Sequence, residues 1–175
     1  YDVSLPGGFR YGDEYQKSAE RCVQICQGED VPVCPLANSN YIIVNKKSQK
    51  VLTIASGSTN NSASVVQYLN RGYNYQQWAL EALTDNGGDL TGYYVHSLRN
   101  PNMNMETGGF QVKEGATVSV YQTTKGENQR WTCEYAGDGY YKIRNYQSGL
   151  YLEVVDGSTQ NNANLRMCAS ATEDH

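Results

Sequence analysis

The sequence predicts an all-β domain made of three similar units of about 50 residues each. The first observation is an internal repeat: residues 41–68 align with residues 141–168 at an offset of 100, without a gap, and share ten of 28 positions. The second is a looser middle copy at residues 93–131. The third is that no helical period of apolar residues occurs between residues 41 and 175.

Each copy contains about four short runs that alternate apolar and polar residues, as expected for half-buried strands. In the first copy these runs are YIIVN at 41–45, KVLTI at 50–54, SVVQY at 64–68 and QQWAL at 76–80. Clusters such as SGSTNNS and DGSTQNN separate the runs and are typical of turns. About twelve strands in three equivalent sets can close around a pseudo-threefold axis, which leaves no strand edge unpaired.

Residues 1–40 differ in character and form a separate arm before the first repeat. Ser18 is a suitable N-cap for a short helix, and Gly28 is a suitable end. Cys26 near the end of this helix can reach Cys34 after the turn, so we expect a disulfide between them. The run LPGG followed by SAERCVQIC resembles the first half of a PAN/apple domain. A small disulfide-tied helical arm is the preferred interpretation, and a partial PAN/apple domain is the alternative.

The chain has five cysteines, so at least one thiol is free or is bonded outside the chain. They are Cys22, Cys26, Cys34, Cys133 and Cys168. A zinc site on the first three would lack a nearby fourth ligand, because the only histidines are His96 and His175. A secreted, disulfide-containing glycoprotein is favoured instead, and the sequon at Asn60 fits that compartment. Because the chain begins at Tyr1 and no signal peptide is visible, we expect a processed or partial chain.

Composition narrows the function classes. A net charge of −4 without a basic run gives no reason to expect nucleic-acid binding. No apolar stretch approaches the ~20 residues that span a bilayer. No nucleophile motif and no metal-spaced histidines occur, so neither an enzyme nor a cofactor is expected. The 15 tyrosines against two phenylalanines suit half-buried strands and polar ligand surfaces alike.

Both tryptophans lie two residues after a glutamine, in Gln76-Gln77-Trp78 and Gln129-Arg130-Trp131. Two such Q-x-W motifs in a threefold repeat resemble the ricin B-type lectin domain, a β-trefoil that also serves as a carbohydrate-binding module. The resemblance implies that each Trp lies in the core and that each Gln ties its hairpin together by hydrogen bonds. It covers residues 41–175, with repeats at roughly 41–84, 85–135 and 136–175.

The third repeat is expected to be truncated. An offset of 100 from Trp78 places its tryptophan at position 178, whereas the sequence ends at His175. A trefoil without its last hairpin would expose core surface and unpaired strand edges. We therefore expect the last strand to come from a longer, nicked or partner chain.

The resemblance also implies a shallow sugar pocket in each repeat. An acid or amide follows the leucine of the second strand, an aromatic stands on the third strand, and an Asn precedes the Gln of Q-x-W. The acid or amide accepts hydrogen bonds from sugar hydroxyls, and the ring covers the apolar face of the sugar. The middle repeat matches best when Met103 is taken as the leucine, and we expect Asn104 at the surface end of its strand. The expected residues are Asn104, Tyr121, Asn128 and Gln129.

The other two repeats depart from this pattern. The first keeps Tyr68 and Gln76 but has Thr53 in the acidic position and Tyr75 in place of the Asn. For each Tyr, ordinary strand packing is the alternative to a binding role.

In the third repeat Glu153 stands in the acidic position, but Cys168 replaces the aromatic. We therefore expect the middle site to be the strongest and the third to be weak or absent.

The leading functional hypothesis is a non-catalytic lectin that binds glycans, with galactose-type sugars as the family expectation. Single shallow pockets bind weakly, so useful avidity would come from several sites or from a partner chain or oligomer. The alternative is a protein-binding β-trefoil that acts through its loops, such as a protease inhibitor or a toxin or haemagglutinin subunit.

Overall fold

The computed structural model describes residue 36 and residues 38–170 of the chain. This part contains eleven β-strands and five single-turn 3₁₀-helices, and no α-helix occurs in it. The strands are β1 (Asn40–Tyr41), β2 (Val51–Ile54), β3 (Ala63–Tyr68), β4 (Trp78–Thr84), β5 (Leu90–Ser97), β6 (Met103–Thr107), β7 (Val118–Gln122), β8 (Arg130–Gly137), β9 (Tyr140–Asn145), β10 (Tyr151–Val154) and β11 (Ala163–Cys168). The 3₁₀-helices are η1 (Ala55–Gly57), η2 (Asn74–Gln76), η3 (Gly108–Phe110), η4 (Glu127–Gln129) and η5 (Val155–Gly157).

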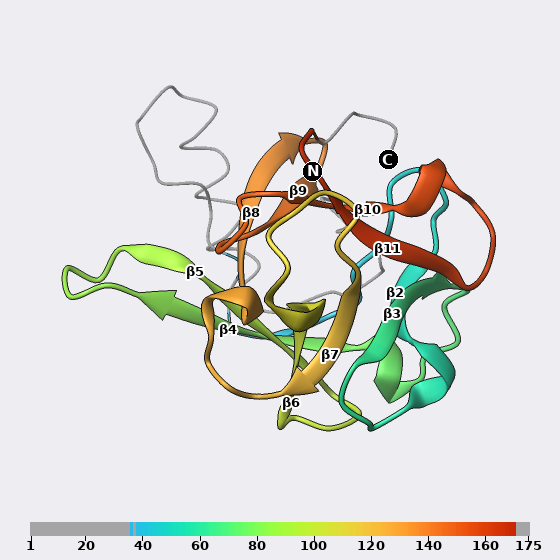
Figure 1. The fold of residues 1–175 in the computed structure, drawn as a ribbon, viewed down its shortest axis with the longest axis horizontal. Helices are drawn as coiled ribbons and strands as arrows, with labels where there is room; N and C mark the ends of the chain where they lie inside the picture. Colours follow the sequence, from blue (N-terminus) through green and yellow to red (C-terminus); the bar gives the residue numbers. More distant parts are fainter. Residues whose placement is uncertain (1–35, 37, 171–175) are drawn as a thin grey trace, which may run out of the picture.

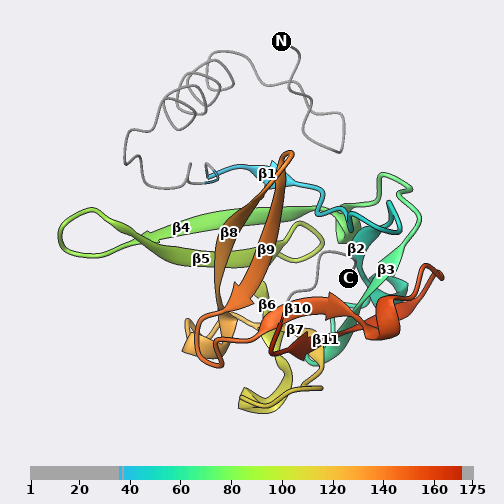
Figure 2. The same cartoon turned by 90° about the horizontal axis from the view of Figure 1, so that it is seen from above.

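The strands divide into three units that follow the predicted repeats, and all pairings are antiparallel. Each unit has a central hairpin, β2–β3, β6–β7 or β10–β11, with a 3₁₀ turn between its two strands. The longer strands β4, β5, β8 and β9 pair with one another in chain order, with β5 also beside β8. Figure 2 shows the β8–β9 hairpin crossing the β4–β5 hairpin, and in Figures 1 and 2 the β4–β5 hairpin extends well beyond the other strands.

Three equivalent backbone hydrogen bonds join the repeats in a ring. Ser62 N–H donates to the carbonyl of Val120, Gly115 N–H to Met167, and Asn162 N–H to Gln67, each at 2.8 Å. The first repeat therefore bonds to the second, the second to the third, and the third back to the first. Such closure is what a pseudo-threefold axis requires, and it confirms the predicted all-β trefoil.

Both tryptophans are fully buried at equivalent positions, as predicted. The indole N–H of Trp78 donates to the carbonyl of Leu52 at 3.1 Å, and that of Trp131 donates to the carbonyl of Met105 at 2.9 Å. A buried indole N–H needs such an acceptor, so each Trp fixes its strand to the second strand of its own repeat. The surrounding core is mainly Val, Leu and Met.

These contacts correct the predicted alignment of the middle repeat. The counterpart of Leu52 is Met105 and not Met103, because Trp131 bonds to Met105 as Trp78 bonds to Leu52. The acidic position is therefore Glu106. Asn104 was expected at the surface end of a strand, but the structure buries it completely.

The predicted arm, with its Cys26–Cys34 disulfide and its PAN/apple resemblance, lies outside the described residues. Cys133 and Cys168 are free thiols. Burial raises the pKa of the Cys133 thiol to about 12, so it stays protonated at neutral pH. No helix in the described ranges is long and apolar enough to cross a membrane.

Candidate functional site

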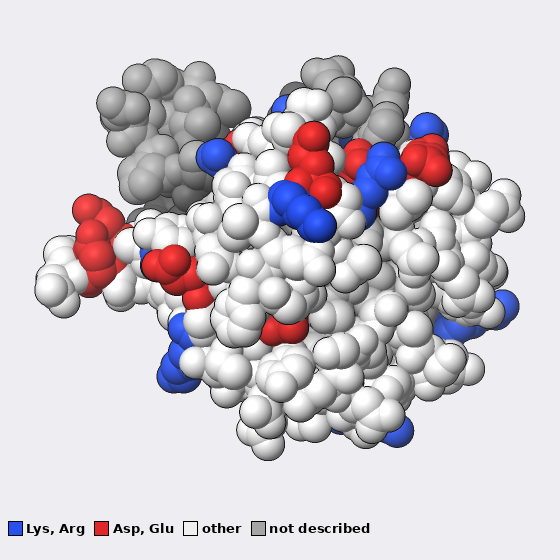
Figure 3. Space-filling view, in the orientation of Figure 1, with Lys and Arg blue, Asp and Glu red and all other residues white. Residues whose placement is uncertain are grey.

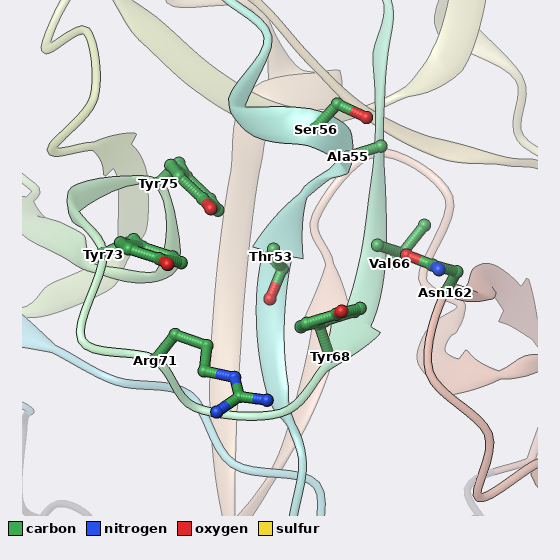
Figure 4. Close-up of a pocket in the computed structure, with 9 residues that line it drawn as sticks. All are labelled: Thr53, Ala55, Ser56, Val66, Tyr68, Arg71, Tyr73, Tyr75 and Asn162. Carbon is green, nitrogen blue, oxygen red and sulfur yellow. The ribbon is translucent and has the colours of Figure 1, made fainter.

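The first repeat has an open pocket of about 410 Å³ between β2, β3 and the loop that leads to Q-x-W (Figure 4). One lining residue, Asn162, comes from the third repeat, because the turn before β11 packs on β3. The lining residues are Thr53, Ala55, Ser56, Val66, Tyr68, Arg71, Tyr73, Tyr75 and Asn162.

Tyrosine rings form two walls of this pocket. Tyr73 and Tyr75 stack with ring centroids 4.9 Å apart and an interplanar angle of 26°. Tyr68 stands on the other side, with Thr53 between the two walls (Figure 4). Tyr75 can lie there because its neighbour is Gly57: a Cβ on that glycine would approach Tyr75 Cδ1 to 2.8 Å. The first wall therefore depends on a pair of residues, a glycine in η1 and a tyrosine in η2.

The floor of the first pocket has little hydrogen-bonding capacity left. The Thr53 hydroxyl donates to the carbonyl of Val51 at 2.9 Å and accepts from Gln76 Nε2 at 3.2 Å. Gln76 also donates to the carbonyl of Leu69 at 2.8 Å and accepts from the Arg71 N–H at 2.7 Å. Gln76 is completely buried, so it acts as a hairpin tie and does not reach the pocket surface.

The middle repeat replaces this open pocket with a buried polar cluster around Glu106. Its carboxylate is only 5% exposed and accepts hydrogen bonds from Asn128 Nδ2 at 3.0 Å and Gln129 Nε2 at 3.3 Å. Gln129 also donates to the carbonyl of Gln122 at 2.9 Å and accepts from the Thr124 N–H at 2.9 Å. Burial raises the pKa of Glu106, and the hydrogen bonds from Gln129 and Asn128 offset part of that rise.

The cluster contains polar atoms that lack partners. Over the described ranges, four buried side-chain atoms make no hydrogen bond: Asn104 Oδ1, Thr107 Oγ1, Ser119 Oγ and Asn128 Oδ1. All four belong to the middle repeat. Ser119 lies directly across from Glu106 in the β6–β7 pairing. A buried polar atom without a partner costs about 1–3 kcal/mol and often marks a functional position.

Two aromatic side chains stand near the cluster. Tyr121 is half-buried and lies on the same face of β7 as Ser119, since alternate residues of a strand share a face. Phe110 is 62% exposed and has φ of 59°, at the position where the other repeats have Gly57 and Gly157. Its ring approaches Gly126, which lies two residues before Asn128.

The third repeat satisfies its acid internally. Arg166 Nε donates to Glu153 Oε1 at 2.6 Å, and Arg166 Nη1 donates to Asp156 Oδ1 at 3.2 Å. Arg166 takes the place held by Ser119 in the middle repeat. Cys168 stands where the other repeats have a tyrosine, and its thiol donates to the carbonyl of Ser170 at 3.3 Å. This repeat therefore presents an ion pair in place of an acid and a ring.

The structure thus brings Asn128 and Gln129 to Glu106, and it places Tyr121 on the same face of β7 as Ser119, the residue across from Glu106. Sequence reasoning missed Glu106, although a signal existed: Tyr68 to Tyr121 and Trp78 to Trp131 share an offset of 53, which carries Thr53 to Glu106. It also missed Ser119, which lies across from Glu106, and Phe110, whose ring approaches Gly126.

The described part of the chain contains no group of three or more His, Cys, Asp or Glu residues placed to hold a metal ion. On the side of the molecule that faces the viewer in Figure 1, the surface is largely uncharged, and its acidic and basic side chains lie among one another (Figure 3).

Comparisons with known proteins agree with this fold. A search of curated proteins found no match. Among solved structures, the designed threefold-symmetric protein ThreeFoil is 31% identical, with 77% of this chain and 92% of ThreeFoil covered and a TM-score of 0.71. An exo-β-1,3-galactanase from Clostridium thermocellum is 30% identical, with a TM-score of 0.69 over 77% of this chain, which spans 28% of that enzyme.

The Macrolepiota procera ricin B-like lectin, solved in complex with lactose, shares the fold at 14% identity; the alignment covers 82% of this chain and 94% of the lectin with a TM-score of 0.65. The family model described as a ricin-type beta-trefoil lectin domain-like domain matches residues 33–121 and 91–168. Together these matches span most of the chain, which therefore belongs to the ricin-type β-trefoil lectin-like family.

Proposed function

We propose that the protein is a non-catalytic lectin and that the Glu106 cluster of the middle repeat holds a sugar. The observation that carries this proposal is a buried carboxylate beside two oxygens without a partner, Asn128 Oδ1 from η4 and Ser119 Oγ from the face of β7 that carries Tyr121. A carboxylate accepts hydrogen bonds from two neighbouring hydroxyls, and the Ser119 hydroxyl can donate or accept another. The ring of Tyr121 would cover the C–H face of the sugar.

Galactose-type sugars are the natural first probes, because a module 30% identical to this chain belongs to an exo-β-1,3-galactanase. One such pocket supplies few contacts, so the expected affinity is in the millimolar class. Useful avidity would come from a second pocket on the same chain or from several chains on one surface.

NMR titration of the whole chain with galactose and lactose tests the proposal. We expect shifts at Tyr121, Asn128 and Gln129, and loss of about tenfold in affinity for Glu106→Gln, because a hydrogen bond to a charged group contributes about 1.5–3 kcal/mol. Glu127→Gln is the matched control, since Glu127 is an exposed acid of η4 next to Asn128. Burial disfavours the charged form of Glu106, so Glu106→Gln should keep its fold.

Two outcomes would overturn the proposal. A folded Glu106→Gln protein that binds galactose at full strength places the sugar elsewhere. A chain that binds no saccharide on a glycan array favours the alternative of a protein-binding trefoil.

We also propose secretion with glycosylation at Asn60. Its side chain lies in an exposed turn between η1 and β3, which supports access by a transferase. Intact-mass measurement before and after N-glycan removal, on protein from a secreting eukaryotic host, tests this. An unchanged mass would contradict it.

A further inference from the structure

The first-repeat pocket lacks the carboxylate that its two counterparts carry. Thr53 occupies the position of Glu106 and Glu153, and Val66 occupies that of Ser119 and Arg166. None of the residues that line this pocket is acidic, and the one charged residue among them is Arg71. The other two repeats place a carboxylate on the floor, paired with Arg166 in the third, whereas this one has a guanidinium and no carboxylate.

The guanidinium of Arg71 is available to a ligand. The backbone of this residue is fixed by the 2.7 Å bond from its N–H to Gln76 Oε1, and the next turn is held by Gly72 N–H donating to Asn70 Oδ1 at 3.0 Å. Its side chain makes no ion pair or hydrogen bond with the residues that the structure describes. Figure 4 shows it reaching across the opening between Tyr73 and Tyr68.

The rest of the pocket can stack against a sugar ring, but it lacks the carboxylate that would accept hydrogen bonds from sugar hydroxyls in the middle repeat. Three tyrosines supply ring faces for C–H groups and phenol tips for hydrogen bonds. The Thr53 hydroxyl already donates to Val51 and accepts from Gln76. A neutral sugar therefore finds stacking surface but no carboxylate acceptor, whereas an anionic group finds five guanidinium donors in a planar fork.

We propose that the first-repeat pocket binds an acidic saccharide, with the sugar ring against the tyrosines and a carboxylate or sulfate paired with Arg71. This inference rests on the proposed lectin function, but it concerns a separate pocket with its own ligand class. A carboxylate and a sulfate both present oxygens that match the fork of a guanidinium, so the shared chemistry is an anionic oxygen group at the edge of the ring.

Matched ligands test the proposal on the whole chain by NMR titration. Galacturonic acid and galactose differ at C6, where a carboxylate replaces a hydroxymethyl group, and galactose 6-sulfate places a sulfate there. Glucuronic acid and N-acetylneuraminic acid extend the series to other ring shapes. We expect the acidic sugars to shift Tyr68, Tyr73 and Tyr75, and galactose to shift Tyr121 and Asn128.

Arg71→Gln should weaken the preferred acidic sugar about tenfold, the loss expected for one charge-assisted contact. It should leave galactose binding at the middle repeat unchanged. Arg99→Gln is the matched control, because Arg99 is an exposed arginine outside both sites, and it should change neither affinity. The affinity of Arg71→Lys for the acidic sugar should fall between that of the unmodified chain and that of Arg71→Gln, since lysine keeps the charge but loses the planar fork of donors.

The comparison of uronate with sulfate decides the source of the anion. The proposal is overturned if no acidic sugar shifts the three tyrosines more than galactose does, or if Arg71→Gln binds them at full strength. A failure of the proposed function would give a different result. Galactose would then cause no shift at Tyr121 and Asn128, whatever the acidic sugars do at the first repeat.

Discussion

The first and middle repeats share a backbone and a hairpin tie but solve the same local problem in opposite ways. The first places a small residue in the turn after β2, Gly57, and a ring before Q-x-W, Tyr75. The middle places the ring in the turn, at Phe110, and a small polar residue before Q-x-W, Asn128. The exchange turns an open aromatic pocket into a buried polar cluster, so a conserved frame can carry two different sites.

The largest expected effect is the loss of stability when either buried glutamine, Gln76 or Gln129, is removed. Gln76→Ala and Gln129→Ala should each lower the free energy of unfolding by about 3 kcal/mol, because each removes buried hydrogen bonds and leaves their partners unsatisfied. Gln129→Ala should cost about 1 kcal/mol more, since Gln129 donates to the charged Glu106 carboxylate where Gln76 donates to the neutral Thr53 hydroxyl. Urea denaturation of both variants measures the difference. Equal losses would mean that Glu106 gains nothing from Gln129.

Because the first repeat has glycine in the turn after β2, a larger residue in that turn should clash with the ring before Q-x-W. Gly57→Ala should destabilise the protein by about 2 kcal/mol, because Gly57 has φ of 62° and the new Cβ would meet Tyr75. The variant should also displace the Tyr75 ring and weaken ligand binding at the first pocket. Thermal unfolding measures the first effect and NMR of the tyrosine rings the second. Gly109→Ala is a control, since Gly109 also has a positive φ, of 63°, but open space around it.

The two pockets should respond differently to acid. Burial raises the pKa of Glu106 above its ordinary value, so the carboxylate is lost at a higher pH than for an exposed Glu. Affinity for galactose at the middle repeat should fall about tenfold per pH unit below that raised pKa. The first pocket has no acid in its lining, so its affinity for a sulfated sugar, whose charge does not change in this range, should stay constant.

The raised pKa of Glu106 has the opposite effect on folding stability from its effect on sugar affinity: acid strengthens the first and weakens the second. The folded state favours protonated Glu106 more than the unfolded state does, so this group contributes stability at low pH that is lost as pH rises through the raised pKa. Weaker binding in acid would therefore not reflect unfolding caused by Glu106. Titration calorimetry across the range, with Glu106→Gln as a pH-independent reference, measures the effect. A pH-dependent Glu106→Gln protein would contradict it.

The smallest expected effect concerns the strained turn of the middle repeat. Phe110→Gly should stabilise the fold by about 1 kcal/mol, because a non-glycine residue at positive φ carries a cost that glycine does not. A folded variant with lower stability would show that the Phe110 ring packs more firmly than its exposure implies.

The family resemblance implied the burial of both tryptophans, and the sequence alone determined the fold class, the three repeats and the positions of Tyr68, Tyr121 and the two Q-x-W motifs. These features depend on spacing along the chain, because strand alternation and turn length set which residues face the core. The one error of register, Met103 for Met105, came from treating the middle copy as shifted when a single offset of 53 relates it to the first.

Only the tertiary structure decided what each pocket offers to a ligand. Asn162 reaches the first pocket from the third repeat, Arg166 pairs with Glu153, and Ser119 faces Glu106 without a partner. Each depends on how side chains from separate strands or separate repeats meet, and on which of their hydrogen bonds are already made. The closure of the trefoil brings Asn162 to the first pocket, and the strand register inside each hairpin sets Arg166 against Glu153 and Ser119 against Glu106.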